Sequence, residues 1–164
     1  MLLKFKDFIT EAKLPDDELG CYVAVNYKNQ TNRIFKQISE LLLSKSKHHD
    51  DYHTTLIYSK CSGSFAQLQN VKLCPQLTLR NVTLKTKHLG KNNECLVLLI
   101  EHEWFKNRHS QLMKEHNFSY DFDEYTAHVT LTYIDKDNVP DDMTFVVDLY
   151  LDDEYKQPVN EDYA

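Results

Sequence analysis

Two histidine–threonine pairs offer the clearest chemistry in the sequence. His53 begins the hexapeptide HTTLIY and His128 begins HVTLTY, so the pattern His-x-Thr-Leu-x-Tyr occurs twice. Histidine titrates near neutrality, so one imidazole can accept a proton from an attacking hydroxyl while the other donates a proton to the leaving oxygen. Threonine hydroxyls can donate hydrogen bonds to phosphoryl oxygens as charge develops on them. The two pairs together are suited to phosphodiester chemistry without a metal.

Both motifs are typical of β-strands, which would bring the members of each pair together. Side chains i and i+2 project from the same face of a strand, so His53 would lie beside Thr55, and His128 beside Thr130. The Leu and Tyr of each motif would project the other way, into a core. One such pair alone favours a structural role, but its repetition at matching places in two halves favours catalysis. No carboxylate cluster accompanies the pairs at ligand spacing, so we expect neither a metal nor another cofactor.

The composition indicates one compact folding unit. A chain of 164 residues can bury a sizeable core, and a net charge of −6 argues against a protein that coats long nucleic acid. The sequence shows no run of about eighteen apolar residues and no signal-peptide pattern, so we expect a soluble, intracellular protein without a membrane span. Its three glycines form no phosphate-binding loop, and its four cysteines, without a C-x-x-C pair, are expected to be small buried side chains.

The apolar pattern predicts the element order β-α-β-β-β-α-β-β. Strands are expected at Cys21–Tyr27, within YHTTLIYS, at Gln76–Lys87, at Glu94–Ile100, within HVTLTYI and at Thr144–Tyr155, and helices at Gln30–Lys47 and Glu103–Asn117. Each half places a helix ahead of a His-x-Thr strand. This predicts an α+β domain with two sheet-bearing lobes around one cleft. The acidic tail from Asp152 is a candidate lid over that cleft.

Paired His-x-Thr strands in a bilobal α+β domain resemble the two-histidine (2H) phosphoesterase superfamily. The chain is also similar to phage anti-CBASS nucleases, which degrade the cyclic oligonucleotides with which bacteria signal infection. Four segments carry this similarity, namely CYVAVNY, YHTTLIYS, YDFDEYTAHVTLTY and LDDEYKQPV. The similarity runs from Gly20 to Val159. It implies a 2H fold in which two antiparallel sheets flank a central cleft and the helices lie outside.

The resemblance also implies an active site. His53 and His128 would form the acid–base pair, and Thr55 and Thr130 would hold the scissile phosphate. The residues alone do not indicate which histidine is the acid and which is the base.

Three further residues gain a substrate-binding role from the resemblance. Tyr22 would contact a base, and Glu154 would help to position the substrate. The related nucleases stack a tryptophan on a nucleobase near the strand that here includes Thr86–His88, where this chain has no tryptophan. His88 is the candidate replacement, because imidazole can stack on a base. From the residue pattern alone, Tyr22 would be a core residue, Glu154 a solvated one and His88 an ordinary turn residue.

The implied activity is that of a metal-independent phosphodiesterase. It would hydrolyse cyclic di- and trinucleotides, such as 3',3'-cyclic GMP-AMP, to linear products with a 3'-phosphate, in the host cytoplasm during infection. Two alternatives remain: a 2H enzyme that acts on 2',3'-cyclic phosphates or 2',5'-linked oligonucleotides, and a non-enzymatic sponge that sequesters the cyclic nucleotide. The preferred nucleotide and the oligomeric state stay open at this point.

Residues 1–19 form an N-terminal extension ahead of the domain at residues 20–164, and we expect it to lack a counterpart in the related nucleases. Its segment FKDFITEA resembles the capsid-targeting leader of T-even-type phage internal proteins. In those leaders a maturation protease cuts after a glutamate in an Ile-x-Glu context, and the matching residue here is Glu11. The resemblance implies packaging in the virion. The alternative is a short amphipathic helix packed on the domain.

Overall fold

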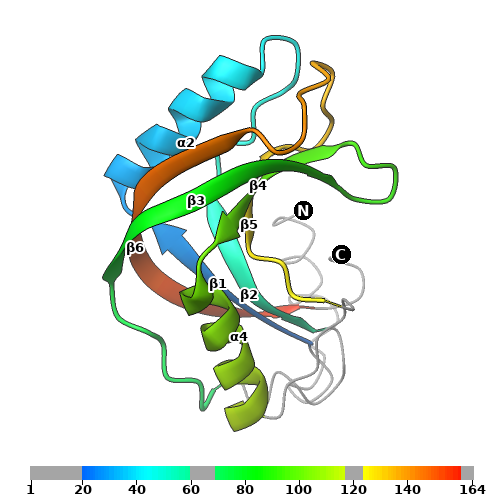
Figure 1. Ribbon diagram of the computed structural model, residues 1–164. Helices are drawn as coiled ribbons and strands as arrows, with labels where there is room; N and C mark the ends of the chain where they lie inside the picture. Colours follow the sequence, from blue (N-terminus) through cyan, green and yellow to red (C-terminus); the bar gives the residue numbers. More distant parts are fainter. Residues whose placement is uncertain (1–19, 60–68, 117–123, 160–164) are drawn as a thin grey trace.

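A computed structural model describes residues 20–59, 69–116 and 124–159 of the chain (Figure 1). These residues form, in order, β1 (Gly20–Tyr27), α2 (Asn29–Leu42), β2 (His53–Ser59), β3 (Leu77–Leu89), β4 (Cys95–Glu101), α4 (Glu103–His116), β5 (His128–Thr132) and β6 (Thr144–Val159). The predicted element order is confirmed. The α2 helix ends earlier than expected because Leu43 takes an extended backbone, with φ −117° and ψ 106°. The leader and Glu11 lie outside the described residues.

The strands form one antiparallel sheet of six, in the order β2-β1-β6-β3-β4-β5, so the prediction of two separate sheets was wrong. The reason is the length of β6. Its first half, Thr144 to Leu151, pairs with β3, and its second half, Leu151 to Val159, pairs with β1. The segment from Asp152 to Val159 is therefore a central strand of the sheet and not a lid.

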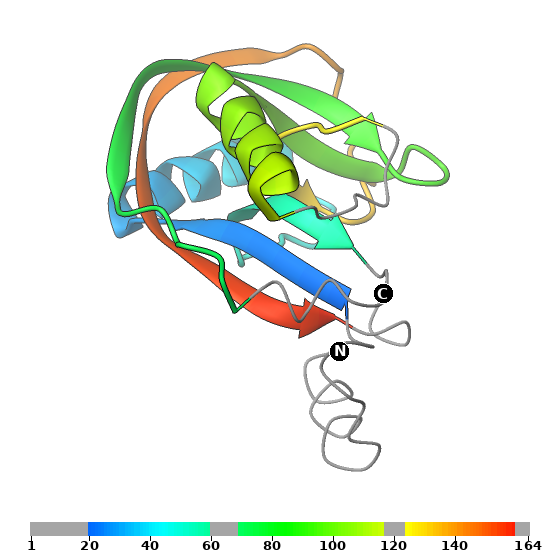
Figure 2. The same cartoon turned by 90° about the horizontal axis from the view of Figure 1, so that it is seen from below.

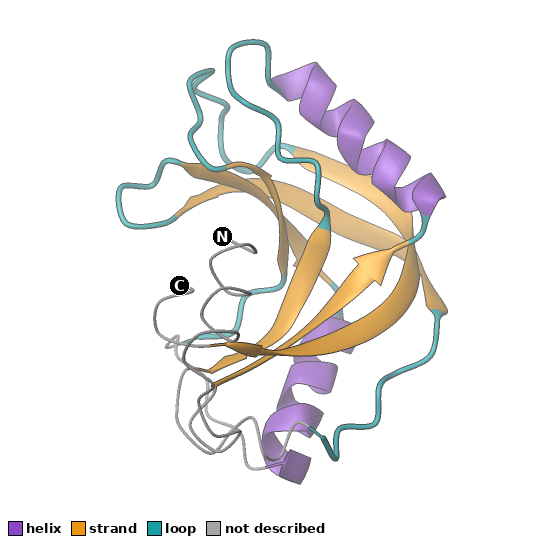
Figure 3. Ribbon diagram, turned by 180° about the vertical axis from the view of Figure 1, so that it is seen from behind, coloured by secondary structure: helices purple, strands orange, loops and turns teal. Residues whose placement is uncertain are grey.

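The sheet curls so far that its two edge strands, β2 and β5, lie side by side (Figures 1 and 3). The Thr54 hydroxyl in β2 donates to the main-chain oxygen of His128 in β5 at 3.1 Å. The pairing register shifts at four places, near Val23, Val25, Leu79 and Leu96. Such irregularities bend and twist a sheet locally. Because each edge strand carries one His-x-Thr motif, the curling brings the motifs together.

Both helices cover one apolar face of the sheet, which we call the core face. Figures 1 and 2 show α2 and α4 at opposite ends of the curled sheet. Phe35 of α2 and Phe105 and Leu112 of α4 are fully buried there. The sheet contributes further buried residues, including Val23, Val25, Leu56, Leu84, Leu98, Val129, Leu131 and Leu149. Burial of such a side chain contributes roughly 1.5–3 kcal/mol. Neither helix of the described residues has the length and apolar character that crossing a membrane requires.

The motif leucines lie in this core as predicted, whereas the motif tyrosines do not. Leu56 and Leu131 are both 0% exposed, but Tyr133 is 61% exposed. Tyr58 of β2 lies opposite Tyr22 of β1, and the centroids of the two rings are 6.2 Å apart. The register shifts in β1–β2 and β4–β5 explain the difference, because each adds a residue and reverses the alternation beyond the motif threonine.

Candidate active site

His53 and Thr55 of β2 and His128 and Thr130 of β5 are half-buried, while the residues between and after them are fully enclosed. This alternation places each His-x-Thr pair on the side of its strand opposite the core face. We call this side the motif face. Tyr22 of β1 belongs to it as well, since its ring lies edge-on to the His53 ring with centroids 6.3 Å apart.

Each motif imidazole makes a hydrogen bond of the same kind to its local backbone. His53 Nδ1 lies 3.1 Å from the main-chain oxygen of Asp51, and His128 Nδ1 lies 2.8 Å from that of Thr126. A carbonyl oxygen only accepts hydrogen bonds, so Nδ1 carries a proton in both rings. Nε2 is then the nitrogen that can exchange a proton with a substrate. In each motif the acceptor lies two residues before the histidine, so the local backbone sets the tautomer.

The surroundings of the two imidazoles differ. Burial lowers the pKa of His128 below its ordinary value of 6.5, the bond to Thr126 opposes this, and the charge of His53 lowers the pKa further. His128 is therefore neutral near pH 7. The carboxylate of Asp51 lies 3.7 Å from His53 Nδ1, where it can pair with the imidazolium form. The hydrogen bond from Thr54, the residue after His53, to the main-chain oxygen of His128 places the two motifs side by side.

The motif threonines have ordered neighbours. The Thr55 hydroxyl lies 3.1 Å from the Tyr22 hydroxyl, and burial raises the pKa of Tyr22, so that phenol stays protonated. Thr130 lies beside Cys95. Burial raises the pKa of the Cys95 thiol, although a hydrogen bond from Thr130 acts in the opposite direction. The structure thus brings Tyr22, a predicted substrate contact, to the first motif.

Residues of α4 and of the segment before β5 donate hydrogen bonds to the main chain of β2, the strand of the first motif. His109 Nδ1 donates to the main-chain oxygen of Leu56 at 2.6 Å. The His109 ring stacks on Tyr125, with centroids 4.1 Å apart and an interplanar angle of 8°. The Tyr125 hydroxyl donates to the main-chain oxygen of Thr55 at 2.8 Å. These contacts fix β2 beside the second motif.

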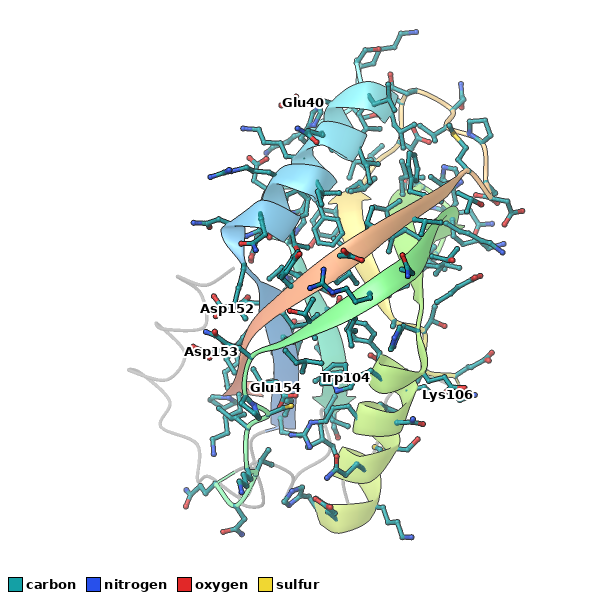
Figure 4. All side chains as sticks on the ribbon, turned by 60° about the vertical axis from the view of Figure 1, so that its left-hand side comes forward. Glu40, Trp104, Lys106, Asp152, Asp153 and Glu154 are labelled. Carbon is teal, nitrogen blue, oxygen red and sulfur yellow. The ribbon has the colours of Figure 1, made fainter. Side chains whose placement is uncertain are left out.

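Glu154 does not lie with the motif residues. It pairs with Val25 of β1, whose side chain belongs to the core, and is only 3% exposed. Arg108 of α4 donates from Nε to Oε2 at 2.9 Å and from Nη2 to Oε1 at 2.8 Å, and the Cys74 N–H donates to Oε1 at 2.9 Å. Figure 4 shows Glu154 on the α4 side of β6. Its carboxylate therefore joins α4 to the sheet, and a role of Glu154 in positioning the substrate stays a prediction.

His88 also lies apart from the motifs. Its Nδ1 is 2.7 Å from Asp141 Oδ1 and its Nε2 is 2.7 Å from Asp135 Oδ2. Burial lowers the pKa of His88, but the two carboxylates outweigh it, so the net shift is upward. With both ring nitrogens bonded to carboxylates on the β5–β6 connection, the ring is an imidazolium held in an ionic network. These bonds occupy the edge of the ring and not its faces, so stacking of His88 on a base stays a prediction.

Two aromatic residues without a predicted role lie beside the motifs. The His49 ring is 6.4 Å from the His53 ring and 4.9 Å from the Tyr133 ring, edge-on in both cases. Burial raises the pKa of Tyr133, and Cys95 and Asp51 raise it further. Tyr133 is the last residue of the second hexapeptide. Strand alternation assigned it to the core, and only the register shift exposes it.

A metal site and a separate pocket are the other features to consider in the described part of the chain. No group of three or more His, Cys, Asp or Glu side chains there is arranged to hold a metal ion. An open pocket of about 430 Å³ lies between β4, the start of α4 and the segment before β5, lined by Leu99, Ile100, Glu101, His102, Glu103, Lys106, Tyr125, Thr126 and Ala127. It contains none of the four motif residues.

Comparison with known proteins identifies relatives over nearly the whole chain. The family model of the anti-CBASS protein Acb1 matches residues 19–164. The chain is 28% identical over 172 residues to the Acb1 protein of Enterobacteria phage T4, covering 99% of this chain and 97% of the relative. It is 27% identical over 159 residues to the Acb1 protein of Yersinia phage phiR1-RT, covering 88% and 92%. The T4 alignment extends into residues 1–19, for which we expected no counterpart.

A solved structure supports the fold. The apo form of E. coli LigT, a 2H phosphoesterase, matches with a TM-score of 0.51 at 10% identity, covering 87% of this chain and 98% of LigT. At this identity the likeness concerns the fold alone, and it confirms the predicted 2H fold. The family match spans both His-x-Thr strands and every described element. The chain belongs to the Acb1 family of anti-CBASS proteins.

Proposed function

We propose that the protein is a metal-independent phosphodiesterase that hydrolyses the cyclic di- and trinucleotide signals of CBASS immunity in the infected host. One observation carries this proposal. Two imidazoles on adjoining edge strands each direct Nδ1 to a main-chain carbonyl, so that Nε2 of each is the proton-transfer atom. A matched pair of this kind serves proton transfer, which a sponge that only sequesters a ligand would not need.

The proposed first step is attack by the substrate's own 2'-hydroxyl on the adjacent phosphorus. Neutral His128 accepts the hydroxyl proton at Nε2, the P–O5' bond breaks, and protonated His53 donates its proton to the leaving O5'. The product is a 2',3'-cyclic phosphate. Water then opens it with the roles reversed: His53 takes a proton from water, His128 returns one to O2', and a 3'-phosphate remains. Each acid or base contributes roughly a hundred- to ten-thousandfold in rate.

Hydroxyl groups stabilise the transition state in this proposal. Thr55 and Thr130 donate to the non-bridging oxygens of the scissile phosphate, one from each motif. The contact at 3.1 Å between Tyr22 and Thr55 holds the Thr55 hydroxyl in place. A preorganised donor of this kind is worth roughly a hundred- to a thousandfold in rate.

Substrate recognition falls to the aromatic residues around the motifs. Tyr133, 61% exposed and packed edge-on against His49, presents a ring on which a nucleobase of 3',3'-cyclic GMP-AMP can stack. This ring takes the place of the tryptophan that the chain lacks on β3. Glu154 acts indirectly, by holding α4 and its His109 against the strand of the first motif.

The test is the identity of the product. The purified protein is incubated with 3',3'-cyclic GMP-AMP in excess EDTA, and the products are resolved by chromatography and mass spectrometry. A linear dinucleotide that ends in a 3'-phosphate, with a transient 2',3'-cyclic phosphate before it, is expected. Cleavage of a 2'-deoxy analogue at an undiminished rate would refute attack by the 2'-hydroxyl. Cleavage only of 2',5'-linked or 2',3'-cyclic substrates, or binding without cleavage, would replace the proposal with one of its alternatives.

A further inference from the structure

The two motif histidines lie on opposite edges of one sheet, so its strand ladders do not set their separation. In the strand order, β2 and β5 are the first and last members. Their relative position depends on contacts across the seam, the region where residues 44–54 meet residues 128–139. Acid–base catalysis by two side chains is sensitive to such placement, because a displacement of about 1 Å can cost about a hundredfold in rate.

Single hydrogen bonds cross the seam at several points. The His49 N–H donates to the main-chain oxygen of Leu131 at 2.8 Å. The Thr132 hydroxyl donates to the main-chain oxygen of Lys47 at 2.6 Å. With the Thr54 bond to His128, these contacts follow the edges of the two strands.

Asp137 makes the densest contact across the seam. Its Oδ1 accepts from the Ser44 N–H at 3.1 Å, the Ser44 hydroxyl at 3.0 Å and the Lys45 N–H at 2.9 Å. Its Oδ2 accepts from the N–H and the hydroxyl of Ser46. The Ser46 hydroxyl accepts in turn from the Lys136 N–H at 2.7 Å. The hydroxyl of Ser46 above all holds the pKa of Asp137 well below its ordinary value. One carboxylate thus binds three consecutive residues of the loop that leads into β2.

The loop that carries Asp137 is itself fixed from β3. Asp135 accepts from the main-chain N–H groups of Asp137 at 2.7 Å and Val139 at 2.9 Å. Its Oδ2 also lies 2.7 Å from His88 Nε2, and Asp141 holds the other ring nitrogen of His88. The chain of contacts therefore runs from β3 through His88 and Asp135 to Asp137, and from there to the loop before His53.

We propose that Asp137 is a positioning residue that sets the placement of His53 against His128, with His88 and Asp135 holding the loop that presents it. This inference rests on the proposed phosphodiesterase activity. It gives the ionic network around His88 a role in catalysis at a distance.

The matched variants are Asp137→Asn and Asp148→Asn. Like Asp137, Asp148 accepts a hydrogen bond from a main-chain N–H, that of Asn81 at 2.9 Å, and it accepts a second from Arg80 Nη1 at 3.0 Å. It lies on β6 beside β3 and away from the seam. In Asp137→Asn the amide NH2 group, which is a hydrogen-bond donor, would face donor groups of the loop residues 44–46. We expect this variant to lower kcat on 3',3'-cyclic GMP-AMP by about ten- to a hundredfold with KM changed less than about twofold. Asp148→Asn should keep both constants. Equal kcat in the two variants would overturn the proposal.

A second readout does not depend on the substrate. In the free protein, imidazole Cε1–H resonances of His53 and His128 should shift in Asp137→Asn and stay in place in Asp148→Asn. Ser46→Ala, which removes one hydroxyl, should shift them in the same direction and serves if Asp137→Asn fails to fold. Unchanged resonances of both rings would overturn the positioning role even if the wild type cleaves the substrate. If the wild type cleaves nothing, the proposed function fails, and the resonances alone decide the role of Asp137.

Discussion

The two motif imidazoles are matched in tautomer and unlike in environment. Each donates its Nδ1 proton to a carbonyl two residues earlier. Burial and the charge of His53 lower the pKa of His128, whereas Nδ1 of His53 lies 3.7 Å from the carboxylate of Asp51. The lowered pKa of His128 supports the base role that we propose for it in the first step.

The lowered pKa of His128 predicts the acid limb of the pH–rate profile. A general base loses activity as pH falls through its pKa and it becomes protonated. Because the pKa of His128 lies below the ordinary value of 6.5, kcat/KM should stay high at pH 6.5 and fall only at lower pH. The measurement is kcat/KM for 3',3'-cyclic GMP-AMP across the acidic range. An acid limb at or above pH 6.5 would contradict the assignment of His128 as the base.

Thr55→Val keeps the shape of the side chain and removes the hydroxyl that we place on the scissile phosphate. We expect kcat to fall by about a hundredfold with little change in KM, since the lost bond strengthens only in the transition state. Thr78→Val, at an exposed position of β3, is the control and should match the wild type. A Thr55→Val enzyme within about twofold of wild type would remove Thr55 from the mechanism.

Tyr133→Ala tests the stacking role of the exposed ring. Stacking of a base on an aromatic side chain is worth about 1–3 kcal/mol, so KM or Kd should rise by roughly five- to a hundredfold. Tyr133→Phe keeps the ring and should restore binding. Ile134→Ala, at a neighbour that is 52% exposed, controls for loss of apolar surface. Equal affinities of Tyr133→Ala and Ile134→Ala would count against stacking.

Strand alternation was sufficient to place the four motif residues, because residues i and i+2 of a strand project from the same face. It failed for Tyr133, where a register shift reverses the alternation just beyond Thr130. It could not place Glu154 or His88. Their partners lie 46 residues away for Glu154 and 47 and 53 residues away for His88, and a local pattern carries no information on such distant ion pairs.

The long strand β6 and the helix α4 hold the halves of the sheet together. The sequence predicted a strand at Thr144–Tyr155, although the acidic residues from Asp152 also suggested a lid. The strand continues to Val159, where the polar residues Lys156 and Gln157 gave no strand signal. The pairing with β1 makes the second half of β6 a strand, and the buried ion pair with Arg108 accommodates Glu154 there. Both the pairing with β1 and the ion pair with Arg108 depend on the tertiary fold, so the sequence pattern did not indicate them.

Arg108→Met tests this joint. The substitution would leave the buried carboxylate of Glu154 without its guanidinium partner. Breaking a buried ion pair on one side costs about 3–5 kcal/mol, so urea unfolding should show a loss of that size. Arg33→Met, at an exposed position of α2, is the control and should change stability by less than about 0.5 kcal/mol. A loss below about 1 kcal/mol in Arg108→Met would show that the pair is not a main support of α4.

In the described part of the chain the strands form one sheet that bends until its edges meet, with one His-x-Thr pair on each edge strand. The element order was readable from the sequence, since each element has its own apolar period. The meeting of β2 and β5 was not, because it depends on the length of β6 and on the register shifts along the sheet. The anti-CBASS family, the 2H fold and the two imidazoles are consistent with one activity on cyclic oligonucleotides.

The most direct test of this account separates binding from cleavage in His53→Ala and His128→Ala. Single-turnover cleavage of 3',3'-cyclic GMP-AMP in EDTA is measured beside calorimetric binding, with His116→Ala as a control at the end of α4. We expect each motif variant to lose about a hundred- to ten-thousandfold in cleavage rate while it still binds the ligand. The His116→Ala control should match the wild type. Cleavage at the wild-type rate by either motif variant, or a wild type that binds and does not cleave, would contradict this account.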